Sequence, residues 1–173
     1  MIIALSSLPG SGVEDISKLL ALQLGIKYLP KETILKKMAK KHRKSVQEIE
    51  SLLTSEKFIE ELREFINKEA KSTHVIIDWP LACWVASDSL RVFLYMTQKS
   101  RAETITKKMR VPLSDAREKL SKEDDELKQN ILSLLGINIY DVKNFDLAMN
   151  MDKIGIEGAA SVIMRYLKNI KTR

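Results

Sequence analysis

The stretch MIIALSSLPGSGVEDISKLL, residues 1–20, decides the fold. Residues 2–6 are apolar or small throughout, which is typical of a strand buried on both faces. A turn with two glycines follows, and a helical pattern begins near residue 12. A glycine-rich turn that leads from a buried strand into a helix directs backbone amides toward an anion. Pro9, Gly10, Ser11 and Gly12 therefore occupy the place of a phosphate-binding loop.

Two side chains that such a loop normally needs are absent. The pattern GxxxxGK[ST] supplies a lysine for the phosphates and a hydroxyl for magnesium. The corresponding residues here are Val13 and Glu14, with Asp15 next, and Ser7 replaces the first glycine. At about 5 Å and a dielectric constant of about 20, each carboxylate–phosphate pair would cost roughly 3 kcal/mol. The loop is therefore either a vestigial nucleotide site or a tight turn whose acidic residues interact favourably with the positive end of the helix dipole.

Outward from this loop, short apolar segments alternate with helical patterns. Strands are predicted at 75–78, 91–96 and 146–150, with a weaker one at 27–29. The predicted helices are 12–24, 32–43, 46–70 with a break near 54–55, 101–109, 114–134 and 156–169. This alternation predicts an α/β fold with a doubly wound parallel sheet. We expect one domain, 1–173, with its core in 1–30, 72–100 and 136–173 and helical excursions at 31–71 and 101–135.

Length and composition indicate a globular protein. The chain has 173 residues, of which 45% are hydrophobic and 30% charged, enough for one sizeable core. Its apolar runs are too short to span a membrane, and residues 1–7 lack the features of a signal peptide. We therefore expect a cytoplasmic protein with no membrane partner. Cys83 is the single cysteine and both histidines are isolated, so no metal site is predicted.

The net charge of +6 lies entirely in the first 44 residues, which contain nine Lys or Arg and three acidic residues. Six of these basic residues fall on one predicted helical segment: Lys36, Lys37, Lys40, Lys41, Arg43 and Lys44. At 100° per residue, Lys36, Lys40 and Arg43 share one stripe of the helix. Such a stripe can follow a phosphate backbone. The predicted partner is therefore RNA or a ribonucleoprotein, with a protein partner or a merely solvated face as alternatives.

Several segments together resemble the archaeal-type cytidylate kinases, which are P-loop nucleoside monophosphate kinases. The resemblance runs along the whole chain, and no single motif decides it. It rests on LPGSG at 8–12, LLALQLGIKYL at 19–29, ILKKMAKKHRKSVQEI at 34–49, VIIDWPLACWV at 75–85, SRAE at 100–103, LGINIYD at 135–141 and FDLAMN at 145–150. The resemblance implies a monophosphate-binding segment at 31–71, a lid at 101–135, and ATP with magnesium as cofactors of an active member.

The chain departs from this family where the family binds phosphate through arginines. The corresponding positions hold Lys36, Arg63 to Ile66, Pro80, Thr104, and Lys122 or Glu123. Trp79 replaces a glycine, and we expect its ring to fill space that a nucleotide needs. Because phosphoryl transfer depends on positioned positive charge and magnesium, we predict no catalytic residues and a non-catalytic protein that binds RNA or a ribonucleoprotein such as the ribosome. The alternative is a cytidylate kinase that transfers phosphate from ATP to CMP or dCMP, or a nucleotide-binding regulator.

Two polar residues survive at positions that belong to the family's site. Asp78 follows a predicted strand, where it could hold a magnesium-bound water or cap the next helix; we favour the cap. Arg101 begins the lid-like segment, and a lone arginine at a helix start is usually solvated. We therefore treat Asp78 and Arg101 as a possible residual cleft.

Overall fold

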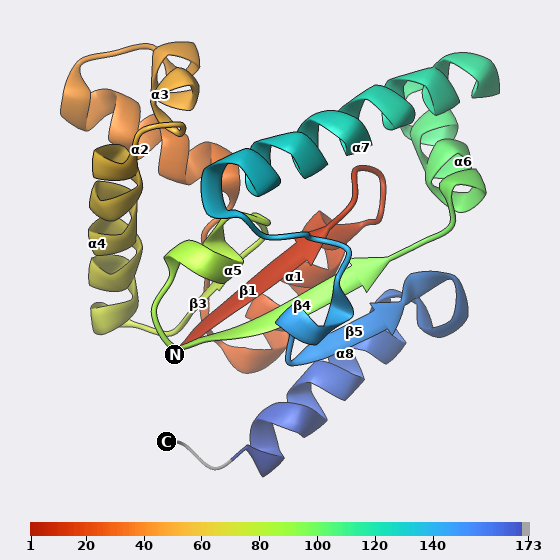
Figure 1. The fold of residues 1–173 in the computed structure, drawn as a ribbon. Coiled ribbons are helices and arrows are strands. Elements are labelled where there is room, and N and C mark those ends of the chain that lie inside the picture. The colour runs from red at the N-terminus through yellow and green to blue at the C-terminus, as the bar shows by residue number, and fades with distance from the viewer. Residues whose placement is uncertain (171–173) are drawn as a thin grey trace.

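A five-stranded parallel sheet forms the centre of the molecule (Figure 1). The structure is a computed structural model, and it describes residues 1–170. The strands are β1 (Ile2–Ser7), β2 (Lys27–Tyr28), β3 (Val75–Ile77), β4 (Ser89–Tyr95) and β5 (Leu147–Asn150), in the order β2-β3-β1-β4-β5. Every residue of the central strand β1 is buried, which explains its uninterrupted run of apolar and small residues. The predicted doubly wound parallel sheet is confirmed, including its weak strand at 27–28.

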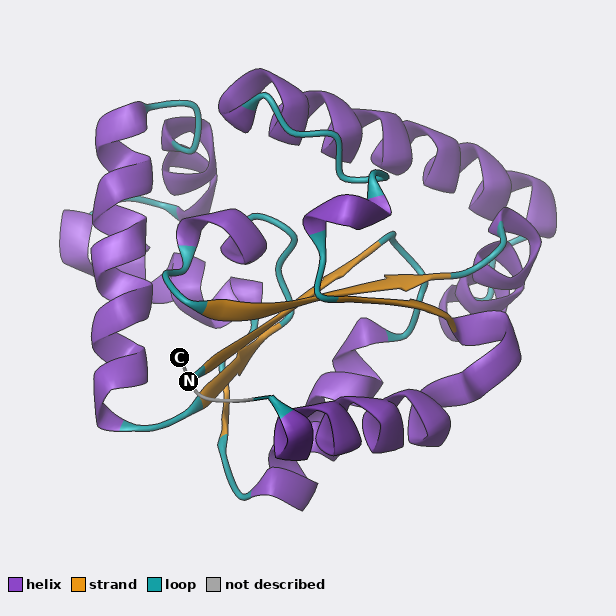
Figure 2. Ribbon diagram, turned by 60° about the horizontal axis from the view of Figure 1, so that its bottom comes forward, coloured by secondary structure: helices purple, strands orange, loops and turns teal. Residues whose placement is uncertain are grey.

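Helices cover both faces of the sheet (Figure 2). They are α1 (Val13–Leu24), α2 (Lys31–His42), α3 (Val46–Leu52), α4 (Glu56–Ser72), α5 (Ala82–Val85), α6 (Gln98–Met109), α7 (Leu113–Leu135) and α8 (Met151–Asn169), with a 3-10 turn, η1, at Val142–Asn144. One core joins the sheet to α2, α3, α4, α5 and the end of α7, and a second joins it to α1 and α8. None of these helices is long and apolar enough to cross a membrane.

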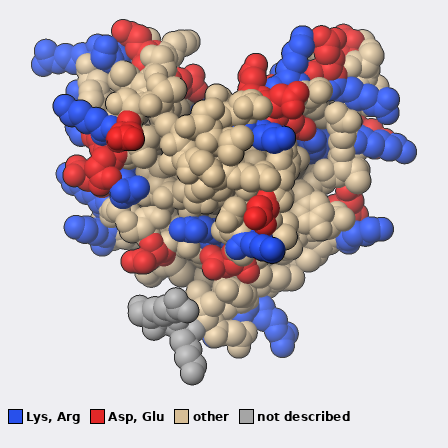
Figure 3. Space-filling view, in the orientation of Figure 1, with Lys and Arg blue, Asp and Glu red and all other residues tan. Residues whose placement is uncertain are grey.

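The segments predicted as excursions are helical and form two groups, α2–α4 and α6–α7. The break predicted near 54–55 is confirmed, because α3 ends at Leu52 and Ser55 precedes α4. Helices α6 and α7 share a small core of their own, built from Ala102, Ile105, Ala116 and Leu120. Figure 3 shows a notch between the two helical groups, and basic and acidic residues are interspersed over both.

Candidate functional site

The loop between β1 and α1 lies at the carboxyl edge of the sheet, where ligands of such folds bind. Gly10 and Gly12 adopt left-handed backbone angles, with φ of 80° and 74°, which glycine adopts without a steric penalty. Gly10 also packs against α6: a Cβ there would lie 3.2 Å from the carbonyl oxygen of Arg101. The Ser11 amide donates to the Leu8 carbonyl at 3.2 Å. These contacts fix a tight loop that larger residues would distort.

Helix α1 begins at Val13 with uncapped amides. Its N-cap is Gly12, which has no side chain to accept from them. Within residues 1–170, the hydrogen bonds present do not use the amides of Gly12, Val13 or Glu14. Free amides at a helix N-terminus carry a partial positive charge and bind anions. The loop thus keeps the backbone features of a phosphate site although the usual lysine and hydroxyl are missing.

Two lysines neutralise Glu14, the carboxylate expected to repel phosphate. Its carboxylate oxygens lie 2.6 Å from Lys18 Nζ and 3.5 Å from Lys108 Nζ. The hydrogen bond from Lys18 is the largest cause that lowers the pKa of Glu14 below its usual value. Lys108 belongs to α6, so its ion pair with Glu14 also links α6 to α1. Glu14, Lys18 and Lys108 together carry a net charge of +1, and counting the adjacent Asp15 makes it zero. The two lysines therefore offset the repulsion expected from the two carboxylates.

Arg101 is buried between the loop and α7, so the expectation of a solvated side chain is wrong. Only 4% of the side chain is exposed. Its Nη1 donates to the Pro9 carbonyl at 3.0 Å and to Asp124 Oδ1 at 2.8 Å, while Nη2 donates to Asp124 Oδ2 at 2.6 Å. Sequence reasoning missed Asp124, because it lies in the acidic run 123–126 and nothing there distinguishes it from its neighbours.

Buried polar atoms without a partner are concentrated around the loop. Among the described residues there are seven such side chains, and five of them belong to the loop, its flanks or the residues beside it: Ser6, Ser11, Ser17, Asp78 through Oδ1 and Arg101 through Nε. Buried polar groups nearly always have a hydrogen-bonding partner. Five such groups in one region leave hydrogen-bonding capacity that the described residues do not satisfy. We call the loop 8–12, the start of α1, Asp78 and Arg101 the loop site.

Asp78 follows β3 and belongs to this site, but it does not cap the next helix as expected. The N-cap of α5 is Leu81, and Asp78 Oδ2 instead accepts a hydrogen bond from the Tyr28 hydroxyl. Burial raises the pKa of the Asp78 carboxyl, and the Tyr28 hydrogen bond opposes that rise. The neighbouring Trp79 is buried in the core cluster that α2–α5 form with the sheet. Its ring is thus accommodated by the core.

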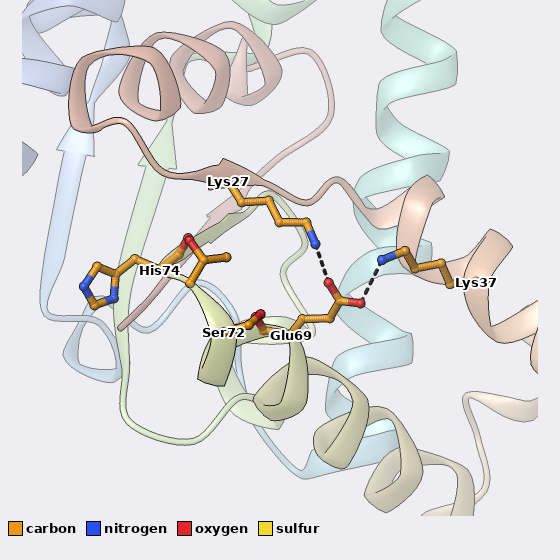
Figure 4. A network of polar contacts seen from close by, with 6 residues as sticks. Lys27, Lys37, Glu69, Ser72 and His74 are labelled. Carbon is orange, nitrogen blue, oxygen red and sulfur yellow. Dashed lines mark hydrogen bonds and ion pairs between the residues drawn. The ribbon is translucent and has the colours of Figure 1, made fainter.

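The basic segment 36–44 is divided into two rows, although α2 ends at His42 and Arg43 adopts left-handed backbone angles. Lys37, Lys41 and Lys44 pair with Glu69, Glu61 and Glu48 at 2.7, 2.5 and 3.7 Å. Figure 4 shows Lys37 and Lys27 both pointing at Glu69. The other row, Lys36, Lys40 and Arg43, is exposed and forms no ion pair with any residue that the structure describes. Only half of the predicted RNA-binding charge is therefore unneutralised within the chain.

Other parts of the described chain offer little as binding sites. Residues 1–170 contain no cluster of three or more His, Cys, Asp or Glu side chains suited to a metal ion. Two open surface hollows, of about 540 and 330 Å³, lie along α8 and beside the N-terminus, and neither includes a residue of the loop site. The loop site remains the strongest candidate.

Comparison with known proteins points in the same direction. Residues 2–153 match the profile of the Cytidylate kinase-like family. A protein named cytidylate kinase from Sulfurisphaera tokodaii is 28% identical over 173 residues, covering 96% of this chain and 95% of its own. Another of that name from Pyrococcus horikoshii is 28% identical over 174 residues, covering 98% and 90%.

Solved structures share the fold at low sequence identity. An uncharacterized protein from Eubacterium ventriosum superposes with a TM-score of 0.79 at 19% identity, covering 98% of this chain and 99% of its own. A deoxyadenosine kinase from M. mycoides, with dCMP and dCDP bound, gives a TM-score of 0.53 at 17% identity and covers 98% and 100%. The sheet and its helical excursions are thus those of small P-loop kinases.

Proposed function

The chain belongs to the cytidylate kinase-like family, and from this premise we propose that it binds cytidine nucleotides at the loop site and phosphorylates CMP slowly with ATP. The concentration of unpartnered buried polar atoms around the loop carries the proposal. These atoms leave hydrogen-bonding capacity that a polar ligand or water would satisfy, at the edge of the sheet where such folds bind ligands. The relatives named cytidylate kinase supply the substrate class.

Each residue of the loop site would have a distinct role in nucleotide binding. The free amides at the start of α1 hold phosphate oxygens, and Lys18 and Lys108 offset the charge of Glu14. Arg101 fixes the loop through the Pro9 carbonyl. ATP would bring magnesium bound mainly to its own phosphates, as is usual for this ion. The described residues form no three-ligand acidic site for it.

The missing lysine, hydroxyl and phosphate-binding arginines together set the expected rate. Loss of one group that stabilises the transferring phosphate typically lowers kcat by about 10²–10³. Kinases typically turn over at roughly 1–100 s⁻¹. We therefore expect formation of CDP to be measurable but well below about 1 s⁻¹, because backbone amides replace only part of the lost charge.

A coupled assay with ATP and CMP, dCMP or UMP tests the proposal. Val13→Lys should increase nucleotide affinity and CDP formation. Leu22→Lys is the matched control, because it adds the same charge on the exposed surface of the same helix, and it should change neither. Nucleotide binding without any CDP would support the non-catalytic regulator, and absence of both binding and turnover would refute the proposal.

A second candidate function is association with RNA or a ribonucleoprotein through Lys36, Lys40 and Arg43. It is favoured by the absence of acidic partners for this exposed row within the described chain. Three neutralised phosphates predict that log affinity falls with log salt at a slope of about −2 to −3. Changing the row to Gln should abolish a gel shift, whereas the α7 control Lys119, Lys122 and Lys128→Gln should not. Sedimentation with ribosomal particles that changes little with salt, together with no RNA gel shift, would instead favour a protein partner.

A further inference from the structure

Tyr28 and Asp78 meet across two neighbouring strands at the edge of the loop site. Tyr28 ends β2 and pairs in register with Ile76 of the parallel strand β3. Asp78 lies two residues beyond Ile76, so its side chain leaves the same face of the sheet. The Tyr28 hydroxyl donates a hydrogen bond to Asp78 Oδ2, and both side chains are half-buried.

The two oxygens of the Asp78 carboxylate are in different situations. Oδ2 accepts a hydrogen bond from Tyr28, whereas Oδ1 is buried and has no partner in good hydrogen-bond geometry among the residues described. The backbone amide of Lys31 lies near enough to the carboxylate to oppose the rise in its pKa, but it does not form a hydrogen bond of normal geometry with Oδ1. An ionised carboxylate has room for about four donors, and a buried acceptor without one is unfavourable. Because Tyr28 fixes the plane of the carboxylate through Oδ2, the direction of Oδ1 is fixed as well. The free oxygen is thus oriented before any ligand arrives.

We propose that Tyr28 is a positioning residue, whose hydroxyl orients Asp78 so that its free oxygen accepts a hydrogen bond from a donor group of the bound nucleotide. The inference rests on the proposed function, because it assumes that nucleotides bind at the loop site. Tyr28 itself need not touch the ligand. Its ring packs against the core between the sheet and α1, so the hydroxyl is the part of the side chain that acts on Asp78.

A double-mutant cycle on nucleotide affinity separates positioning from a structural role. We would measure dissociation constants for CMP, CDP and ATP by calorimetry with Tyr28→Phe, Asp78→Asn and the double variant. Tyr28→Phe should weaken binding of at least one nucleotide about tenfold, the scale of one hydrogen bond to a charged group. The double variant should bind no more weakly than Asp78→Asn alone, because Tyr28 acts through Asp78.

The control is Tyr95→Phe, which removes an exposed hydroxyl from β4 and should leave affinity unchanged. Thermal melting of each variant verifies folding. Additive effects in the cycle, or unchanged affinity in Tyr28→Phe, would overturn the inference and leave the proposed function intact. A wild-type protein that binds none of the three nucleotides would instead refute the proposed function, and the inference with it.

Discussion

Asp124→Ala should destabilise the protein strongly, because it leaves the buried charge of Arg101 without its partner. The Arg101 side chain is 4% exposed and that of Asp124 16%, and they share two hydrogen bonds of 2.8 and 2.6 Å. Breaking one half of a buried pair typically costs about 3–5 kcal/mol. Arg101 keeps its bond to the Pro9 carbonyl, so the lower end, about 3 kcal/mol, is expected.

Thermal unfolding followed by circular dichroism measures this cost. For a chain of 150–250 residues, 1 kcal/mol shifts the melting temperature by about 2–4 °C, so Asp124→Ala should lower it by about 6–12 °C. Hydrogen exchange should increase first in α6 and α7, which share a separate small core. The control is Glu118→Ala, which breaks the solvent-exposed pair with Lys122 in the same helix and should leave the melting temperature unchanged. Equal shifts in the two variants would refute the reasoning.

Three further predictions concern the loop, its glycines and the ion pairs of α4. The double variant Val13→Lys, Glu14→Thr should increase nucleotide affinity more than turnover, because the phosphate-binding arginines stay absent. Calorimetry measures the affinity and the coupled assay the turnover; equal gains in both would contradict the prediction. Gly10→Ala should destabilise the protein by about 1–2 kcal/mol in urea unfolding. The loss should exceed that of Gly25→Ala, because both glycines have positive φ but only at Gly10 would a Cβ contact Arg101. Equal losses would show that α6 moves to make room for the Cβ. Hydrogen bonds from Lys27, then Lys37, hold the pKa of Glu69 below its ordinary value of 4.5, so its contribution is present above that pH and is lost as pH falls through the lowered folded pKa. Glu69→Gln should therefore be less stable than wild type at pH 7, and the difference should shrink as pH falls below the unfolded value and vanish once pH lies below the lowered folded pKa. A difference that does not shrink in acid would indicate lost packing instead.

The strands and the phosphate loop could be predicted from the sequence because their signals are local. β1 and β3 are buried throughout and read as unbroken apolar runs, whereas β4 and β5 are only partly buried but lie where such runs were found too. The glycines of the loop were identifiable because a tight turn between strand and helix demands them. Helix α5, only four residues long, is too short to show a period.

The partners within the site could not be predicted, because they depend on contacts between distant segments. Asp124 reaches Arg101 across 23 residues, and Tyr28 reaches Asp78 across 50. Neither pairing leaves a pattern in one sequence. The free charge of the basic helix was overestimated for the same reason. Glu69 and Glu61, which neutralise Lys37 and Lys41, lie on α4 and not on α2. Charge counted along the chain therefore exceeded the charge that is free on the folded surface.

Isothermal titration of the whole protein with CMP, CDP and ATP, with and without magnesium, tests the central claim most directly. The free amides of the loop and the orphaned polar atoms around it predict saturable binding of at least one cytidine nucleotide. They also predict weaker binding by Asp78→Asn, because its free oxygen is part of the loop site. Absence of binding heat for all three nucleotides at millimolar concentration, in a protein shown to be folded, would contradict the account.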